Sequence, residues 1–226
     1  VTATDRSGAT ATTSFDFTVN DTPAQAADDS VTTAENTPVS ADADNGVLAN
    51  DRDADGTPLT VGQVNARADN VGVIVAGSNG GTFVVSADGS YSFDPGTDFD
   101  ALAPGQTAST SVTYQPLGGD MPATLSVTLT GANDAPTTTG LAPITANVNT
   151  PVQVSLADAF NDIDNGDRLS FSADGLPPGL SLDADTGVIS GTVGPDAARD
   201  MPYQVRVTVT DTAGASVSTA FDYRVV

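Results

Sequence analysis

The sequence contains no cysteine, histidine, lysine or tryptophan. Without cysteine, neither a disulfide nor a thiolate metal site can form. Without histidine, lysine and cysteine, acid–base and nucleophilic catalysis would depend on carboxylates and hydroxyls alone, so we expect a protein that is not an enzyme. A glycosidase-like pair of aspartates is the remaining catalytic alternative. The sequence also lacks any run of 18 apolar residues, so no segment is expected to enter a membrane.

Positive charge is scarce as well. Seven arginines stand against 29 acidic residues, which gives a formal net charge of −22. All but one of the acids are aspartates, and the single glutamate is Glu35. Aspartate is short, favours turns and allows several carboxylates to surround one hard cation. The composition therefore predicts Ca²⁺ binding, and it makes nucleic acid an unsuitable partner because both would be strongly negative.

The apolar residues follow the period of β-strands. Residues 126–129 and 205–209 alternate between apolar and polar side chains. Residues 83–93 and 180–190 each read as two short strands joined by an Asp- and Gly-containing turn. Short strands separated by Gly, Asp and Pro predict an all-β chain of tandem Ig-like or cadherin-like Greek-key β-sandwiches.

The chain also contains an internal repeat. Residues 1–20 align without a gap to residues 207–226, at an offset of 206, and ten of the twenty positions are identical. Asn-Asp-x-Pro segments at 20–23 and 133–136 follow β-type runs and read as linkers. We therefore expect a C-terminal hairpin of a preceding cadherin-like domain (1–20), a first domain (21–136) and a second domain (137–226). The hairpin, without its parent sheet, is expected to be loosely ordered or to pair with a neighbour.

Two resemblances follow from spaced motifs. Residues 137–226 resemble the dystroglycan-type cadherin-like domain, through FNDIDNGDRL at 160–169, LPPGL at 176–180 and VTVTD at 207–211. Residues 24–136 resemble the VCBS and bacterial cadherin-like repeats, through GVLAND at 46–51 and LTGANDAP at 129–136. Such repeats occur in giant bacterial surface proteins, including RTX adhesins that type I systems secrete. The resemblance thus implies cell adhesion, biofilm formation and a stalk stiffened by calcium.

The first acidic loop has carboxylates on alternate residues. Residues 51–56 read Asp-x-Asp-x-Asp-Gly, like the front half of an EF-hand, but the twelfth position is Gly62 and no helices flank the loop. The bidentate ligand must then come from elsewhere, and the only glutamate lies early in the same domain, as the resemblance suggests. The alternative is a set of solvated aspartates that cap their own turns. We predict a calcium site with the ligands Asp28, Asp29, Glu35, Asp51, Asp53 and Asp55.

A second acidic loop follows the second linker. In cadherin-like modules, a linker carboxylate and the loops of both neighbours share junctional calcium. By this resemblance we predict Asp134, Asp162, Asp164 and Asp167 as ligands. Asp211, which closes the end strand, is a further candidate, with a turn before Gly214 as its alternative. Asp21 is the corresponding linker carboxylate ahead of the first domain, whereas Asp183 and Asp185 are assigned to a turn.

These observations favour an extracellular stalk. Tandem domains that project a distant binding site need rigid joints, and a cation at each linker would neutralise the carboxylates there. The expected partners are neighbouring repeats of the same chain. The alternative is a Ca²⁺-dependent module that binds polysaccharide or cell-surface glycans, although the chain lacks tryptophan, a common sugar-stacking side chain.

Overall fold

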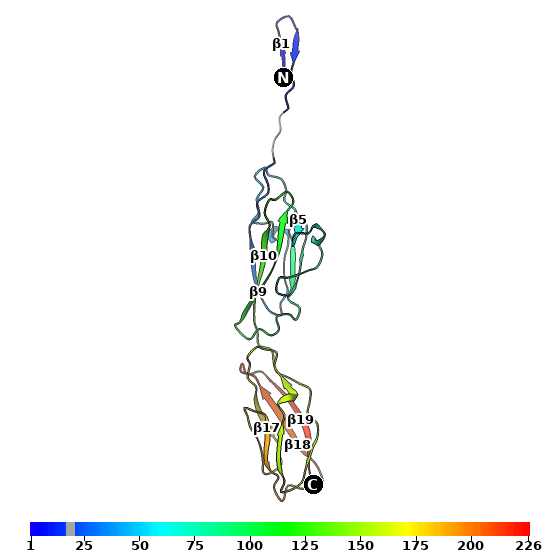
Figure 1. The fold of residues 1–226 in the computed structure, drawn as a ribbon, viewed down its shortest axis with the longest axis vertical. Helices are drawn as coiled ribbons and strands as arrows, with labels where there is room; N and C mark the ends of the chain where they lie inside the picture. Colours follow the sequence, from blue (N-terminus) through cyan, green and yellow to red (C-terminus); the bar gives the residue numbers. More distant parts are fainter. Residues whose placement is uncertain (17–20) are drawn as a thin grey trace.

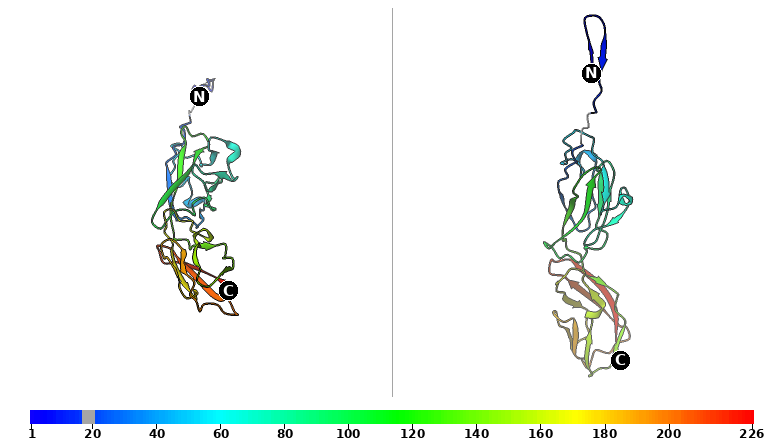
Figure 2. Two further views of the ribbon diagram at one scale, coloured as in Figure 1. Left: turned by 60° about the horizontal axis from the view of Figure 1, so that its bottom comes forward. Right: turned by 45° about the horizontal axis from the view of Figure 1, so that its top comes forward.

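The computed structural model describes residues 1–16 and 21–226. The expected all-β fold is confirmed, because the helical structure amounts to three short 3₁₀ turns, η1 (Ala43–Asn45), η2 (Ala68–Asn70) and η3 (Ala157–Ala159). Two β-sandwiches follow one another along the long axis of the molecule (Figure 1), and the same arrangement is seen in the turned views (Figure 2). Within the described residues, no helix has the length and apolar character needed to span a membrane.

The N-terminal residues form a small hairpin. Strand β1 (Thr2–Thr4) pairs antiparallel with β2 (Thr10–Thr12), and these two strands make a sheet of their own. Their side chains are exposed, and Phe15 just beyond them is 71% exposed. The remaining residues of the expected hairpin, 17–20, lie outside the described part of the chain.

The first module, residues 21–136, consists of two four-stranded sheets. One has the order β3-β10-β9-β5 and the other β4-β8-β7-β6. Side chains alternate along each strand, as in β10, where Leu125, Val127 and Leu129 are buried and the residues between them face outward. The strands are β3 (Asp29–Ala34), β4 (Val39–Ala41), β5 (Val61–Val64), β6 (Val75–Ala76), β7 (Thr82–Val85), β8 (Tyr91–Asp94), β9 (Thr107–Pro116) and β10 (Ala123–Thr130).

The second module, residues 137–226, repeats this plan. Its main sheet has the order β12-β19-β18-β15, and it faces the sheet β13-β17-β16 across a core that includes Ile189, Val207 and Tyr223. The strands are β11 (Thr137–Thr138), β12 (Ile144–Ala146), β13 (Pro151–Ser155), β14 (Phe160–Asn161), β15 (Ser170–Asp174), β16 (Leu180–Leu182), β17 (Val188–Thr192), β18 (Tyr203–Thr210) and β19 (Ser216–Val225).

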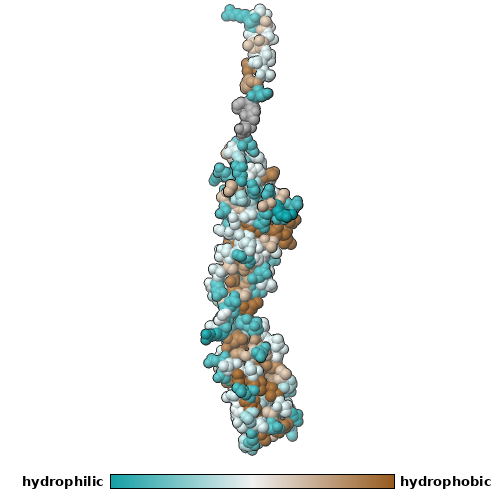
Figure 3. Space-filling view, viewed as in Figure 1, coloured by the Kyte–Doolittle hydropathy of each residue, from teal (hydrophilic) through white to brown (hydrophobic). Residues whose placement is uncertain are grey.

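In both modules a strand near the start of the module runs parallel to the last strand. Strand β3 pairs with β10, and β12 pairs with β19. The end of this early strand is thereby held beside the end of the last, where the chain leaves the module. On the molecular surface, hydrophobic residues are scattered among hydrophilic ones on the face that Figure 3 shows.

Candidate metal centre at the module junction

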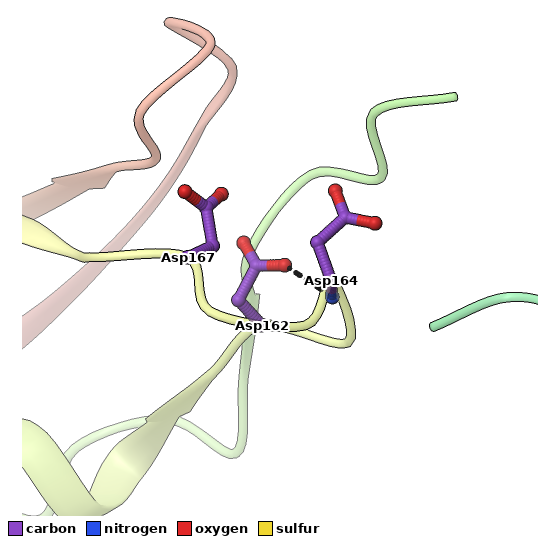
Figure 4. Close-up of side chains that lie close together, drawn as sticks. All are labelled: Asp162, Asp164 and Asp167. Carbon is purple, nitrogen blue, oxygen red and sulfur yellow. Dashed lines mark hydrogen bonds between the residues drawn. The ribbon is translucent and has the colours of Figure 1, made fainter. Parts of the chain in front are cut away.

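Three aspartates gather in the loop between β14 and β15. One carboxylate oxygen from each of Asp162, Asp164 and Asp167 lies within 4.8 Å of the others. The three carboxylates lie on the same side of the loop (Figure 4). The loop is held in shape because the Asp164 N–H donates to Oδ1 of Asp162 at 3.0 Å. Negative groups this close repel one another unless a proton or a cation lies between them.

The turn between β18 and β19 adds a fourth aspartate. Oδ1 of Asp211 accepts from the N–H groups of Gly214 at 2.6 Å and Ala215 at 2.8 Å, and Oδ2 accepts from Nδ2 of Asn133 at 2.8 Å. Burial by itself would raise the pKa of Asp211, but these hydrogen bonds outweigh it and lower the pKa. Asp211 is therefore held as an anion while it contacts the linker of the first module.

The first module contributes its only glutamate. Glu35 follows β3 and is fully buried, and its Oε1 accepts from the N–H of Ala132 at 2.7 Å. Burial raises the pKa of Glu35, and the negative charges of Asp134, Asp164 and Asp100 add to this effect. A carboxylate from one module thus lies in the electrostatic field of a loop from the other.

Asp134 and Asp100 complete the set. The N–H of Asp134 donates to Oδ2 of Asp164 at 3.0 Å, and Asp100 comes from the turn between β8 and β9. The pKa of Asp134 is raised by burial and by the charges of Asp164 and Asp100. Both residues line a cleft of about 260 Å³ between the modules. The term junctional cluster is used below for Glu35, Asp100, Asn133, Asp134, Asp162, Asp164, Asp167 and Asp211.

The junctional cluster has the donor atoms that a hard cation needs. Seven buried side-chain polar atoms in the described residues have no hydrogen-bond partner, and five of them are oxygens of this cluster. A buried oxygen without a partner is costly, more so when it is charged. All the donors are oxygens, and Ca²⁺ takes six to eight of them. The residues therefore fit calcium. The five atoms are Glu35 Oε2, Asn133 Oδ1, Asp162 Oδ2, Asp164 Oδ1 and Asp167 Oδ2.

The prediction that Glu35 joins the loop at 51–55 is wrong. Strand β3 begins at Asp29, and its six residues extend about 20 Å, so Glu35 lies at the opposite end of the module. The parallel pairing of β3 with β10 then places Glu35 next to the linker that follows β10. Proximity along the chain suggested a shared site, whereas the strand direction decides which end of the module each acid occupies.

Asp29 and Asp51 face the interior instead of a common metal loop. Oδ2 of Asp29 and Oδ1 of Asp51 both accept from the Tyr114 hydroxyl, at 3.0 and 3.1 Å, and Asp51 also accepts from the N–H of Ala27 at 2.8 Å. Burial raises the pKa of Asp29 to about 6, with a further contribution from the charge of Asp51. Burial also raises the pKa of Asp51. Asp51 is therefore separated from Asp53 and Asp55, with which it was predicted to form one site.

The other predicted acids of the first module make local contacts. Oδ1 of Asp53 accepts from the N–H of Asp55 at 2.8 Å, and Oδ2 of Asp55 accepts from the N–H of Thr22 at 2.6 Å. Oδ1 of Asp28 accepts from the N–H of Thr124 at 2.8 Å. Asp21 is exposed at the start of the module. These residues are not part of the junctional cluster.

Asp183 has the turn role assigned to it. Its Oδ1 accepts from the N–H of Asp185 at 3.1 Å and from both the N–H and the hydroxyl of Thr186 at 2.8 Å. The hydroxyl of Thr186 is the largest influence that lowers the pKa of Asp183, followed by the backbone N–H groups.

Two members of the junctional cluster were not predicted as ligands. Asn133 was assigned only to the linker, and Asp100 was not assigned a role. A local signal for Asp100 does exist, because it lies between Phe99, which is buried, and Ala101 and Leu102, which are partly buried. Asp100 is itself partly buried, like Ala101 and Leu102.

The fold and this junction define the class of protein. It is a tandem of two β-sandwich modules with cadherin-like and Ig-like folds. Residues 20–131 match the family model described as "Bacterial cadherin-like domain", and residues 135–226 match the one described as "Putative Ig domain". No curated protein matches the sequence.

The chain is similar to several solved structures. The chain is similar to human CDH23 EC21–23, with a TM-score of 0.51 and 17% identity over 87% of this chain and 67% of that one. For domains 1–4 of protocadherin gamma B7 the TM-score is 0.47 and the sequence identity 16%, over 89% of this chain and 49% of the protocadherin chain. A Bacteroides fragilis protein described as a "putative alpha-galactosidase" gives 0.33 and 23%, over 40% of this chain. The chain spans only 17% of that protein and about half of the protocadherin chain.

Proposed function

We propose that this chain is a non-catalytic stalk segment of a large secreted bacterial adhesin, in which Ca²⁺ at the module junction stiffens the stalk. The observation that supports this most strongly is the origin of the junctional cluster. Glu35 and Asp100 belong to the first module, Asn133 and Asp134 to the linker, and the remaining acids to the second module. A cation bound by these oxygens would tie the two modules together.

The cluster divides into two adjoining groups. The carboxylates of Asp100, Asp134 and Asp164 surround Glu35 closely enough to affect its pKa. Those of Asp164, Asp167 and Asp211 stand in the same relation to Asp162, whose pKa is raised chiefly by burial. Because Asp164 belongs to both groups, we propose two neighbouring calcium positions that share this residue. When bound, the calcium supplies positive charge to oxygens that otherwise repel one another.

Direct contacts already orient the modules, and the cation would strengthen them. The N–H of Asn165 donates to the carbonyl of Ala101 at 3.0 Å, and Asn133 and Asp134 bond to the second module. Three such hydrogen bonds contribute about 1 kcal/mol each. At free calcium a thousandfold above Kd, one site adds about 4 kcal/mol. The ion would therefore be the larger contribution to rigidity.

The wider setting rests on resemblance. The bacterial cadherin-like match and the repeat of residues 1–20 at 207–226 support a long array on a bacterial cell surface, with neighbouring repeats as partners. VCBS and dystroglycan-type modules, an RTX adhesin secreted by a type I system, and biofilm formation are part of this proposal. The alternative, a module that binds glycans, lacks support in the described residues, where Phe15 is the one exposed aromatic side chain.

Small-angle X-ray scattering tests the stiffening. With calcium, the chain is expected to show a longer and narrower distribution of interatomic distances than with chelator, because bending at the junction is restricted. Asp164→Asn, which removes the shared carboxylate, is expected to give the chelator curve under both conditions. Asp200→Asn, an exposed acid away from the junction, is the matched control and should behave as the unmodified chain. Identical curves with calcium and chelator would reject the stalk mechanism.

A further inference from the structure

At its N-terminal end, the first module has counterparts of only some residues of the junctional cluster. Its acidic loop is equivalent to that of the second module, because Asp55 N–H to Asp53 Oδ1 at 2.8 Å repeats Asp164 N–H to Asp162 Oδ1 at 3.0 Å. The residues directly before Asp53 and Asp162 also form β-type pairs with the preceding linker, Arg52 with Gln25 in one module and Asn161 with Thr137 in the other. The two ends can therefore be compared position by position.

The linker ahead of the first module has no aspartate at the position equivalent to Asp134. The N–H of Thr22 donates to Oδ2 of Asp55 at 2.6 Å, as the N–H of Asp134 does to Oδ2 of Asp164 at 3.0 Å. A threonine thus stands where the second junction has an aspartate. Asp21, one residue earlier, is exposed.

Two further acids of the second module have no counterpart. From Asp53 to Leu59 the loop is one residue shorter than from Asp162 to Leu169, and it has Thr57-Pro58 in place of Asp167-Arg168. Asp211 directly follows β18, whereas the residue that directly follows β9 is Leu117. This turn exposes two apolar side chains, since Leu117 and Met121 are each 72% exposed. Met121 also lines a cleft of about 430 Å³ beside residues 22–26.

At the C-terminal end of the second module, an apolar residue stands at the position equivalent to Glu35. The N–H of Glu35 donates to the last carbonyl of β10, Thr130 O, at 3.0 Å, and the N–H of Val148 donates to Val226 O, just beyond β19, at 3.1 Å. Both residues also precede the sequence Asn-Thr-Pro-Val, at 36–39 and at 149–152. Val148 is thus the equivalent of Glu35 at the C-terminal end of the second module.

The module that precedes residues 21–136 in an array is of the second type. This follows from the identity between residues 1–20 and 207–226, and the structure adds a common turn. The N–H of Asp5 donates to Ala9 O at 2.9 Å, as that of Asp211 does to Ala215 O at 3.0 Å. A valine equivalent to Val148 would therefore lie on the partner's side of this joint, at the position that Glu35 occupies in the other joint.

We infer that the joints of the array alternate: calcium stiffens the joint after each cadherin-like module, and the joint before it is an apolar contact that does not require calcium. The inference rests on the proposed calcium function of the junctional cluster. The occupant of the surface formed by Leu117 and Met121 is the C-terminal end of an Ig-like module, which has Val148 at the position equivalent to Glu35. Asp21, Asp53, Asp55 and Asp120 remain on one side of this joint, and Asp196 and Asp200 lie in the turn between β17 and β18 on the other, but the positions equivalent to Glu35, Asp134, Asp167 and Asp211 carry no acid.

The test uses the whole chain with residues 137–206 added ahead of Val1, so that the hairpin at 1–20 completes a module. Because the chain has no cysteine, spin labels go only to introduced sites. Thr32→Cys and Ser172→Cys, both at exposed strand positions, span the calcium joint. Thr32→Cys with the same serine changed in the added copy spans the other joint. Distances are measured by electron spin resonance over a calcium titration.

We expect the distance distribution across the calcium joint to narrow with calcium, and the distribution across the other joint to stay unchanged. Leu117→Ser with Met121→Ser should broaden only the second distribution, with and without calcium. Narrowing of both joints at the same calcium concentration would overturn the alternation and leave the proposed function intact. No narrowing at either joint would overturn the proposed function, and the alternation with it.

Discussion

Glu35 and Asp164 belong to different modules, and each has a buried carboxylate oxygen without a hydrogen-bond partner. Glu35 is 0% exposed and Asp164 is 5% exposed, and the charge of Asp164 raises the pKa of Glu35. Two buried anions whose charges repel each other oppose the association of the modules. The same pair favours it once a divalent cation lies between them, so the junction is expected to depend on calcium.

Thermal stability should therefore follow calcium. At free calcium a thousandfold above Kd, each site adds about 4 kcal/mol, which raises the Tm of a module of this size by roughly 10 °C or more. The measurement is differential scanning calorimetry with calcium and with chelator. A Tm that chelator leaves unchanged would contradict the account.

Replacing Glu35 by glutamine should have opposite effects in the two states. Without calcium, Glu35→Gln removes a buried charge that the nearby aspartates repel, so the variant should be at least as stable as the unmodified chain. With calcium, a ligand is lost and the variant should be less stable. Scanning calorimetry with calcium and with chelator measures both effects on Tm. A lower Tm of the variant in both states would show that Glu35 has a purely structural role.

Asp100 can be tested against its neighbour Asp98. Asp100→Asn should weaken calcium binding, because the charge of Asp100 acts on both Glu35 and Asp134. Asp98→Asn is the matched control, since Oδ2 of Asp98 accepts from the N–H of Gly81 at 2.7 Å and serves the fold. The control should lower Tm and leave the calcium Kd unchanged. Equal Kd values for both variants would remove Asp100 from the site.

The turn at Asp183 should be independent of calcium. Its side chain bonds only to its own turn, so Asp183→Ala is expected to lower Tm by the same amount with calcium and with chelator. Asp164→Asn, in contrast, should lower Tm only when calcium is present. A calcium-dependent effect of Asp183→Ala would place a ligand where the structure has a turn.

The buried pair beside Tyr114 predicts a pH dependence. The pKa of Asp29 is raised from 3.8 to about 6, so its protonated form is favoured on folding. This contribution is fully present below pH 3.8 and is lost as the pH rises through about 6. Without calcium, stability of the first module should fall between pH 4 and pH 7, and Asp29→Asn should flatten that part of the profile. Asp69→Asn, an exposed control, should retain it.

Much of the fold could be predicted from local pattern. Alternation along residues 205–209 and the turn between residues 85 and 91 depend on neighbours in the chain, and both are strands and turns as expected. The loop at 162–167 is also local, because Asp164 closes it on Asp162. Such features need no knowledge of which strands lie side by side.

The rest depended on pairing between distant strands. Glu35 reaches the junction because β3 is parallel to β10, almost a hundred residues away in the sequence. Asp51 points to Tyr114 because β9 passes behind its loop, and no local pattern indicates which of three alternating aspartates turns inward. The assignment of these acids to one loop is wrong, because Glu35 lies at the other end of the module and Asp51 bonds to Tyr114.

The most direct test of the account is a calorimetric titration of the chain with Ca²⁺, with Mg²⁺ as the comparison. The account predicts saturable Ca²⁺ binding at the junction that Asp164→Asn abolishes or strongly weakens and Asp200→Asn leaves intact, with weaker binding of Mg²⁺, which dehydrates reluctantly and requires a regular octahedron. Calcium binding that is absent, or that is equally strong in Asp164→Asn, would contradict it.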